Sequence, residues 1–106
     1  MPKYLITGEY TKEGIQGLFK DKATNRVSEV RQTIEKVGGR LEAAYFQLGD
    51  DDVLLIAELP SNTVAAALCL AARQSGLVEV ETTPLLTPEE VDQALIANVN
   101  YRGPGA

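Results

Sequence analysis

Histidine is entirely absent from this 106-residue chain, and cysteine occurs only once, as Cys69. Mechanisms that use imidazole as a general base, as the partner of a nucleophile or as a metal ligand are therefore excluded. A zinc site built from cysteine and histidine is excluded as well, because one thiol cannot supply a tetrahedral ligand set. The single cysteine cannot form an internal disulfide, so we expect packing alone to stabilise the fold in a reducing, cytoplasmic compartment.

Basic residues are few, and long apolar runs are missing. Ten Lys and Arg against fifteen Asp and Glu give a formal net charge of -5. Nucleic acid is not an expected partner, because neutralising phosphates requires clustered basic residues and these are scattered. The longest apolar stretches, Val53–Ala57 and Val64–Ala72, are far shorter than the ~20 residues of a membrane span. No basic-then-apolar signal sequence begins the chain, so we expect neither export nor membrane association.

The hydrophobic pattern predicts one domain over residues 1–100 and a disordered tail over residues 101–106. Strands are predicted at Lys3–Tyr10, Arg40–Leu48, Val53–Leu59 and Val78–Thr82, the last interrupted by Pro84 and placed near a sheet edge. Helices are predicted around Ile15–Phe19, from Asn25 to the glycine stop at Gly38-Gly39 along the apolar stripe Val27, Val30, Ile34 and Val37, and over Val64–Ala72 after an N-cap at Ser61. A last helix is predicted after the N-cap Thr87, with Pro88 at its first position, a capping-box glutamate in Glu89-Glu90 and an apolar stripe of Val91, Leu95 and Val99.

This order of elements predicts an α+β fold of ferredoxin-like βαββαβ topology, with an antiparallel sheet, two helices on one face and an additional C-terminal helix. The second and third strands are apolar on both of their sides. The helices cover only one side, so the other face would be a large exposed apolar patch. We therefore expect a homodimer or a higher homo-oligomer that pairs through the sheet face.

Several segments, taken in order, resemble the GYD-domain family, small bacterial and archaeal proteins that generally have no assigned function. The resemblance extends from Lys3 to about Leu95, and it is carried by Tyr10–Ile15, the helix-to-strand junction Ile34–Leu41, the turn at Gly49 and the segment Val80–Glu90. It implies a ferredoxin-like fold of the dimeric α+β barrel type and no established chemistry. Gly49 and Asp52 match the Gly-x-Tyr-Asp signature, whereas Asp51 stands in place of its tyrosine.

Three residues are candidates for ligand binding: Tyr10, Tyr45 and Asp52. Phenol groups on strands can orient a small organic ligand in a pocket between sheet and helices, although strand aromatics more often pack in a core or an interface. Asp52 corresponds to the signature aspartate, and a local Asx hydrogen bond in the turn is the favoured role for it. No catalytic residue is indicated.

Other reactive side chains favour structural interpretations. The run Asp50-Asp51-Asp52 is interpreted as a solvated turn, because consecutive side chains diverge and cannot converge on a cation. Cys69 lies in an alanine-rich stretch with no basic neighbour, which favours a buried small apolar residue over a reactive thiol. Arg26, Arg31 and Arg40 are interpreted as solvated surface charges. Neither a cofactor nor a metal is predicted.

Two functions remain open at this stage. The first is a non-catalytic, oligomeric binding or accessory domain for a small and largely apolar ligand held between sheet and helices. The second is a cofactor-independent enzyme, in which a tyrosine or a carboxylate in a dry cavity moves a proton on a small aromatic or keto compound. The second interpretation depends on an analogy of fold alone.

Overall fold

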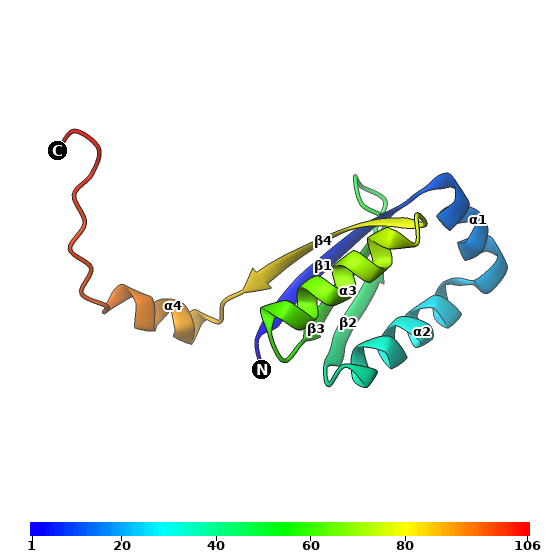
Figure 1. The fold of residues 1–106 in the computed structure, drawn as a ribbon, viewed down its shortest axis with the longest axis horizontal. Coiled ribbons are helices and arrows are strands. Elements are labelled where there is room, and N and C mark those ends of the chain that lie inside the picture. Colours follow the sequence, from blue (N-terminus) through cyan, green and yellow to red (C-terminus); the bar gives the residue numbers. More distant parts are fainter.

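The computed structural model covers residues 1–106 and contains one antiparallel sheet with four helices (Figure 1). The sheet has four strands in the order β2-β3-β1-β4. Their bounds are β1 Lys3–Tyr10, β2 Arg40–Phe46, β3 Val53–Glu58 and β4 Val78–Leu85. Every neighbouring pair is antiparallel, so the chain has the predicted α+β, ferredoxin-like fold.

Short-range signals mark several ends of the four helices. Their bounds are α1 Lys12–Asp21, α2 Ala23–Lys36, α3 Asn62–Gln74 and α4 Pro88–Leu95. The hydroxyl of Ser61 caps α3, and Thr87 forms the predicted capping box with Glu90 at the start of α4. Gly38 follows α2 with a φ of 87°, a left-handed conformation that glycine adopts at no steric cost.

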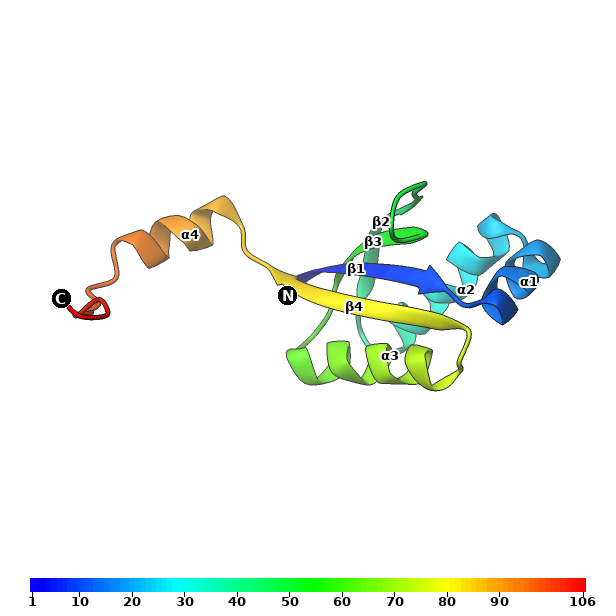
Figure 2. The same ribbon diagram turned by 90° about the horizontal axis from the view of Figure 1, so that it is seen from above.

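Helices α2 and α3 pack on the same face of the sheet, while α1 turns the chain at the end of β1 (Figure 1). Helix α2 packs mainly against β2 and α3 mainly against β4. The opposite face of the sheet has no helix over it (Figure 2). Side chains that point to this uncovered face include Leu5, Leu54 and Ile56, which are half-buried, and Tyr45, which is 68% exposed.

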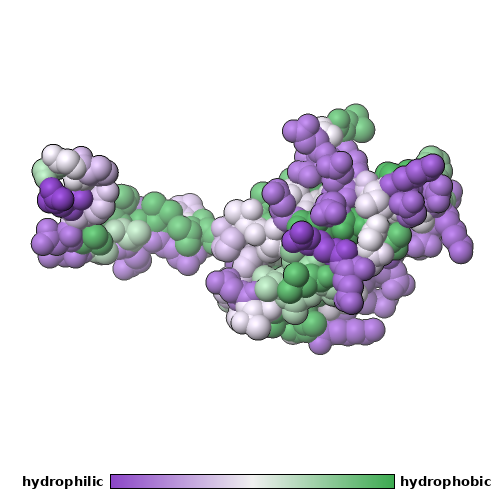
Figure 3. Space-filling view, turned by 45° about the horizontal axis from the view of Figure 1, so that its top comes forward, coloured by the Kyte–Doolittle hydropathy of each residue, from purple (hydrophilic) through white to green (hydrophobic).

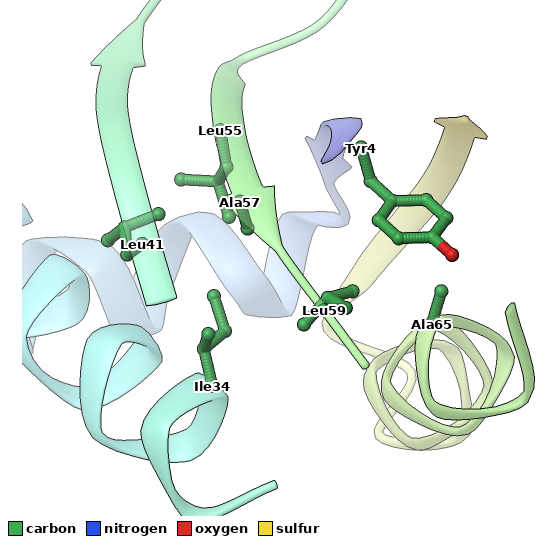
Figure 4. Packing of buried hydrophobic residues seen from close by; sticks show 7 residues of the cluster. All are labelled: Tyr4, Ile34, Leu41, Leu55, Ala57, Leu59 and Ala65. Carbon is green, nitrogen blue, oxygen red and sulfur yellow. The ribbon is translucent and has the colours of Figure 1, made fainter. Parts of the chain in front are cut away.

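The buried core lies between the sheet and the two helices (Figure 4). It consists of seven residues: Tyr4, Ile34, Leu41, Leu55, Ala57, Leu59 and Ala65. Tyr4 is the largest of them, and its hydroxyl donates a hydrogen bond of 2.6 Å to Oδ1 of Asn62 at the start of α3. The polar end of this buried ring is therefore satisfied, which is what a tyrosine in a core requires.

The prediction that Pro84 interrupts the last strand is wrong. Strand β4 continues through Pro84 to Leu85, and Pro84 lies opposite Tyr4 of β1. Since β4 pairs only with β1, it has one unpaired edge, where a residue without a backbone N–H is tolerated. The predicted edge position is confirmed.

Helix α4 lies away from the rest of the molecule, beyond the end of β4 (Figure 1). None of its residues is buried. The predicted apolar stripe of Val91, Leu95 and Val99 extends past its end at Leu95 and is exposed to solvent. No helix of this protein has the length and apolar character that crossing a bilayer demands.

Candidate functional site

A cleft opens between α2 and α3, with the sheet as its floor. It exists because each helix packs against a different outer strand, α2 against β2 and α3 against β4. Its volume is about 370 Å³, and 13 of its 18 lining residues are hydrophobic. The lining consists of Ile6, Thr7, Gly8, Tyr10, Arg26, Val27, Glu29, Val30, Thr33, Ile34, Phe46, Val53, Leu55, Leu68, Ala71, Ala72, Val78 and Val80.

Small residues keep this cleft open. Ala71 and Ala72 form the wall on α3 together with Leu68, and longer side chains at the two alanines would extend toward α2. On the floor, a Cβ at Gly8 would lie 3.0 Å from Cγ1 of Val53 and 3.1 Å from Cγ2 of Val78. A larger residue at position 8 would therefore crowd the floor and reduce the space above it.

Arg26 brings a positive charge to the rim of this apolar cleft. The protein has three ion pairs, Lys3–Glu42, Arg40–Glu58 and Arg73–Glu79, and Arg26 takes part in none of them. The only carboxylate that lines the same cleft is Glu29, one turn along α2, and it is exposed to water. The Arg26 guanidinium is thus available to an acidic group on a bound molecule.

Tyr10 lies at the same end of the cleft and is half-buried. Burial raises the pKa of its phenol above the ordinary value of 10.0, because an apolar environment disfavours the charged form. The Arg26 guanidinium opposes this shift and the Asp52 carboxylate adds to it. At neutral pH the phenol is therefore protonated and can donate a hydrogen bond into the cleft.

Asp52 fastens the β2–β3 hairpin to the end of β1. Its Oδ2 accepts a hydrogen bond of 2.8 Å from the backbone N–H of Tyr10, and its own N–H donates to the Gly8 carbonyl, also at 2.8 Å. The expectation of a local Asx hydrogen bond is wrong, because the partner of this carboxylate is 42 residues away in the chain. The Asp52 carboxylate therefore fixes the backbone of Tyr10, but Asp52 does not itself line the cleft.

Tyr45 is separated from the other two candidate residues. It pairs with Leu54 in the β2–β3 ladder, and the two residues point to the uncovered face of the sheet. The cleft is on the opposite face, where Val53 and Leu55 point. The structure therefore brings Tyr10 and Asp52 together and places Tyr45 elsewhere.

Asp51 borders a second, polar depression on the outer surface. The other residues there are Glu9, Arg73, Glu79, Val80 and Glu81. Nowhere in the structure do three or more Cys, Asp or Glu side chains gather in a way that could hold a metal ion. Cys69 is half-buried, and its Sγ donates to the carbonyl of Val80 at 3.5 Å.

The model of the GYD domain matches residues 4–95 of this chain. The chain belongs to the GYD-domain family. Comparison with curated proteins and with solved structures gave no match. Membership covers every element of the fold, from β1 to α4, and in this GYD domain Asp52 joins the β2–β3 hairpin to β1.

Sequence reasoning missed Arg26 as a candidate site residue. It was assigned to the solvated surface together with Arg31 and Arg40, and Arg40 does pair with Glu58 at 3.0 Å on the exposed surface. Arg26 directly precedes Val27 and so borders the apolar stripe of α2, as Arg31 does directly after Val30; only the structure shows that Arg26 lines the cleft and Arg31 does not. A charged residue bordering an apolar stripe lies at the edge of the buried face, and therefore near any cleft beside it.

Proposed function

We propose that this GYD domain binds a small, largely apolar molecule in the cleft between α2 and α3, and that the molecule carries an acidic group which Arg26 and Tyr10 recognise. The observation that carries the proposal is the cleft itself, at about 370 Å³ with 13 hydrophobic lining residues of 18. Sites for small molecules are typically concave and mostly apolar, measure roughly 300–1,000 Å³ and contain a few convergent polar groups.

Two features support an acidic ligand over a neutral or basic one. Arg26 has no carboxylate partner among the ion pairs of the protein, so its charge is free to pair with a ligand. The protonated phenol of Tyr10 adds a neutral donor beside it. A carboxylate or sulfonate held by these two groups would place the apolar part of the molecule over Val30 and Ala72.

The proposal is tested by titration with anilinonaphthalene sulfonate, a fluorescent aromatic anion. Ala72→Leu fills the cleft, and we expect it to weaken binding of this probe about fivefold or more. Ala66→Leu, on the exposed side of the same helix, is the matched control and should leave the affinity unchanged. If both variants bind like the wild type, the probe sits elsewhere and the cleft is not the site.

We also propose that two copies pair through the uncovered face of the sheet. The support is the set of half-buried apolar side chains there, Leu5, Leu54 and Ile56, which no helix of the same chain covers. A soluble monomer seldom leaves such a contiguous patch in water. The dimeric α+β barrel arrangement expected from the family resemblance would cover it.

A proton-transfer enzyme is the second candidate, favoured by the presence of both a phenol and a carboxylate, Tyr10 and Glu29, at one cleft. Phenylpyruvate, an aromatic keto acid, would serve as the probe. Acceleration of its keto–enol conversion over buffer by the wild type, and loss of that acceleration in Tyr10→Phe with unchanged stability, would support catalysis. No acceleration leaves the non-catalytic binding function as the proposal.

A further inference from the structure

The C-terminal arm, residues 86–101, has large apolar side chains that are exposed to solvent. It comprises α4 and the segments on either side of it, and Figure 3 shows its apolar side chains, in green, at the surface. Leu95, Ile96 and Val99 are 76%, 77% and 76% exposed. Side chains exposed to this degree do not pack against the rest of the chain, although large aliphatic residues are normally buried.

The arm is nevertheless built as a helix with a defined start. Thr87 and Glu90 form a complete capping box, and Pro88 occupies the first turn. A helix of eight residues is marginal in water without tertiary packing, however good its cap. The apolar side of α4, with Val91 and Leu95 one turn apart, therefore requires a surface to pack on.

The arm and the uncovered sheet face lie on the same side of the molecule. Figure 2 shows α4 and the tip of the β2–β3 hairpin rising on the side of the sheet opposite α3. The hairpin tip carries Leu48, which is fully exposed, and Tyr45, on the strand that leads to the tip, is exposed as well. A second body seated on the sheet face would meet the arm and the hairpin as well. The arm points away from its own sheet, so it cannot cover that face itself (Figure 1).

We infer that the C-terminal arm packs onto a second copy of this chain, seated on the uncovered sheet face, and that the two copies exchange their arms. A second copy of this chain would cover both the uncovered sheet face and the apolar side of α4. In a closed two-fold dimer each copy donates one arm and receives one, so the apolar face and the apolar helix are both covered.

The size of the sheet face supports the same occupant. Four strands about 4.8 Å apart and about seven residues long at roughly 3.3 Å per residue give a face of about 440 Å² in outline. Stable dimers bury about 800 Å² per partner. The arm, with six exposed large apolar residues, supplies the further contact area; these are Leu86, Val91, Leu95, Ile96, Val99 and Tyr101.

The inference of arm exchange rests on the sheet pairing proposed above. Variants that add the same charge at different positions of α4 test arm exchange separately from sheet pairing. Leu95→Glu places a charge on the apolar side of α4, whereas Gln93→Glu places the same charge on the opposite side of the same helix. In sedimentation equilibrium of the full-length chain, we expect Leu95→Glu to raise the dimer dissociation constant about tenfold or more. Gln93→Glu should leave it unchanged.

Direct evidence comes from an equimolar mixture of ¹³C-labelled and unlabelled protein, examined with an isotope-filtered NOE experiment. Arm exchange predicts intermolecular NOEs from the methyl groups of Leu95 and Ile96. A dimer without these NOEs, and with Leu95→Glu as tight as the wild type, overturns arm exchange and leaves sheet pairing intact. A wild type that is monomeric at micromolar concentration overturns both.

Discussion

Tyr10 uses its backbone and its side chain for different tasks. Its N–H donates to the Asp52 carboxylate and so holds the hairpin, while its phenol borders the cleft beside Arg26. Because the backbone is fixed by a charge-assisted hydrogen bond, the ring has a defined position at the end of β1. The contribution of Asp52 to the site is therefore positional, through Tyr10.

The raised pKa of Tyr10 predicts a specific alkaline response. The unfolded chain loses the phenolic proton near pH 10, whereas the folded protein retains it to higher pH. The stability contributed by the neutral phenol is therefore complete below pH 10 and is lost as the pH rises above 10 toward the folded pKa. Urea unfolding at about pH 8 and about pH 11 measures this loss.

In Tyr10→Phe the loss of unfolding free energy between the two pH values should be smaller than in the wild type. Tyr101→Phe, on the exposed arm, controls for the removal of a phenol as such. Equal losses in all three proteins would show that burial of Tyr10 has no energetic consequence.

Arg26 provides a second prediction at this scale. Arg26→Gln should weaken binding of anilinonaphthalene sulfonate about tenfold, because a charge-assisted interaction with the sulfonate is removed. Arg31→Gln, further along α2 and outside the cleft lining, removes the same charge from the protein. Equal weakening in the two variants would point to a nonspecific effect of net charge and would contradict a direct contact with Arg26.

Helix α1 contains two glycines that differ in the space available for a side chain. A Cβ at Gly14 would overlap the backbone carbonyl of Leu77, whereas a Cβ at Gly17 would meet nothing within 4 Å. Gly14→Ala should therefore lower the free energy of unfolding by roughly 2 kcal/mol, because backbone has to move. Gly17→Ala should raise it by up to about 1 kcal/mol, because alanine is the better helix former.

Urea denaturation of both variants beside the wild type measures this difference. Equal effects of the two substitutions would mean that α1 does not pack as closely on the loop before β4 as the structure has it.

Local chemistry was sufficient to predict most of the elements. The apolar stripe of α2, the stop at Gly38 and the capping box of α4 are short-range signals, and each was found where the sequence placed it. Strand β4 was predicted too short, because a proline breaks a ladder only where its missing N–H is needed. Position 84 lies on an edge strand, and the sequence pattern had indicated that edge without showing that the strand could continue.

The site was less predictable, since it depends on long-range contacts. The hydrogen bond from Tyr10 to Asp52 joins residues 42 positions apart, so no local pattern reveals it. Tyr45 and Phe46 are neighbours on one strand, and only the register with β3 decides which of them faces the cleft. The cleft itself arises from the distance between α2 and α3, which no single segment encodes.

For the whole molecule, the uncovered sheet face yields the prediction on assembly. Ile56 lies at its centre, opposite Leu5 on one side and Ala43 on the other. Ile56→Glu should convert a dimer into a monomer, because a charge in that position would be buried without a partner. Leu70→Glu, at a 62% exposed position on α3, should remain dimeric, and sedimentation velocity distinguishes the two outcomes. A dimeric Ile56→Glu would contradict sheet pairing.

The most direct test of the binding function locates the probe on the protein. We would record ¹⁵N–¹H correlation spectra of the full-length chain during titration with anilinonaphthalene sulfonate. Binding in the cleft predicts the largest shift changes at amides of α2 and α3 that border it, including Arg26, Val30 and Ala72, and at Tyr10. Shift changes confined to the uncovered sheet face or to the C-terminal arm, or none at all, would contradict the account.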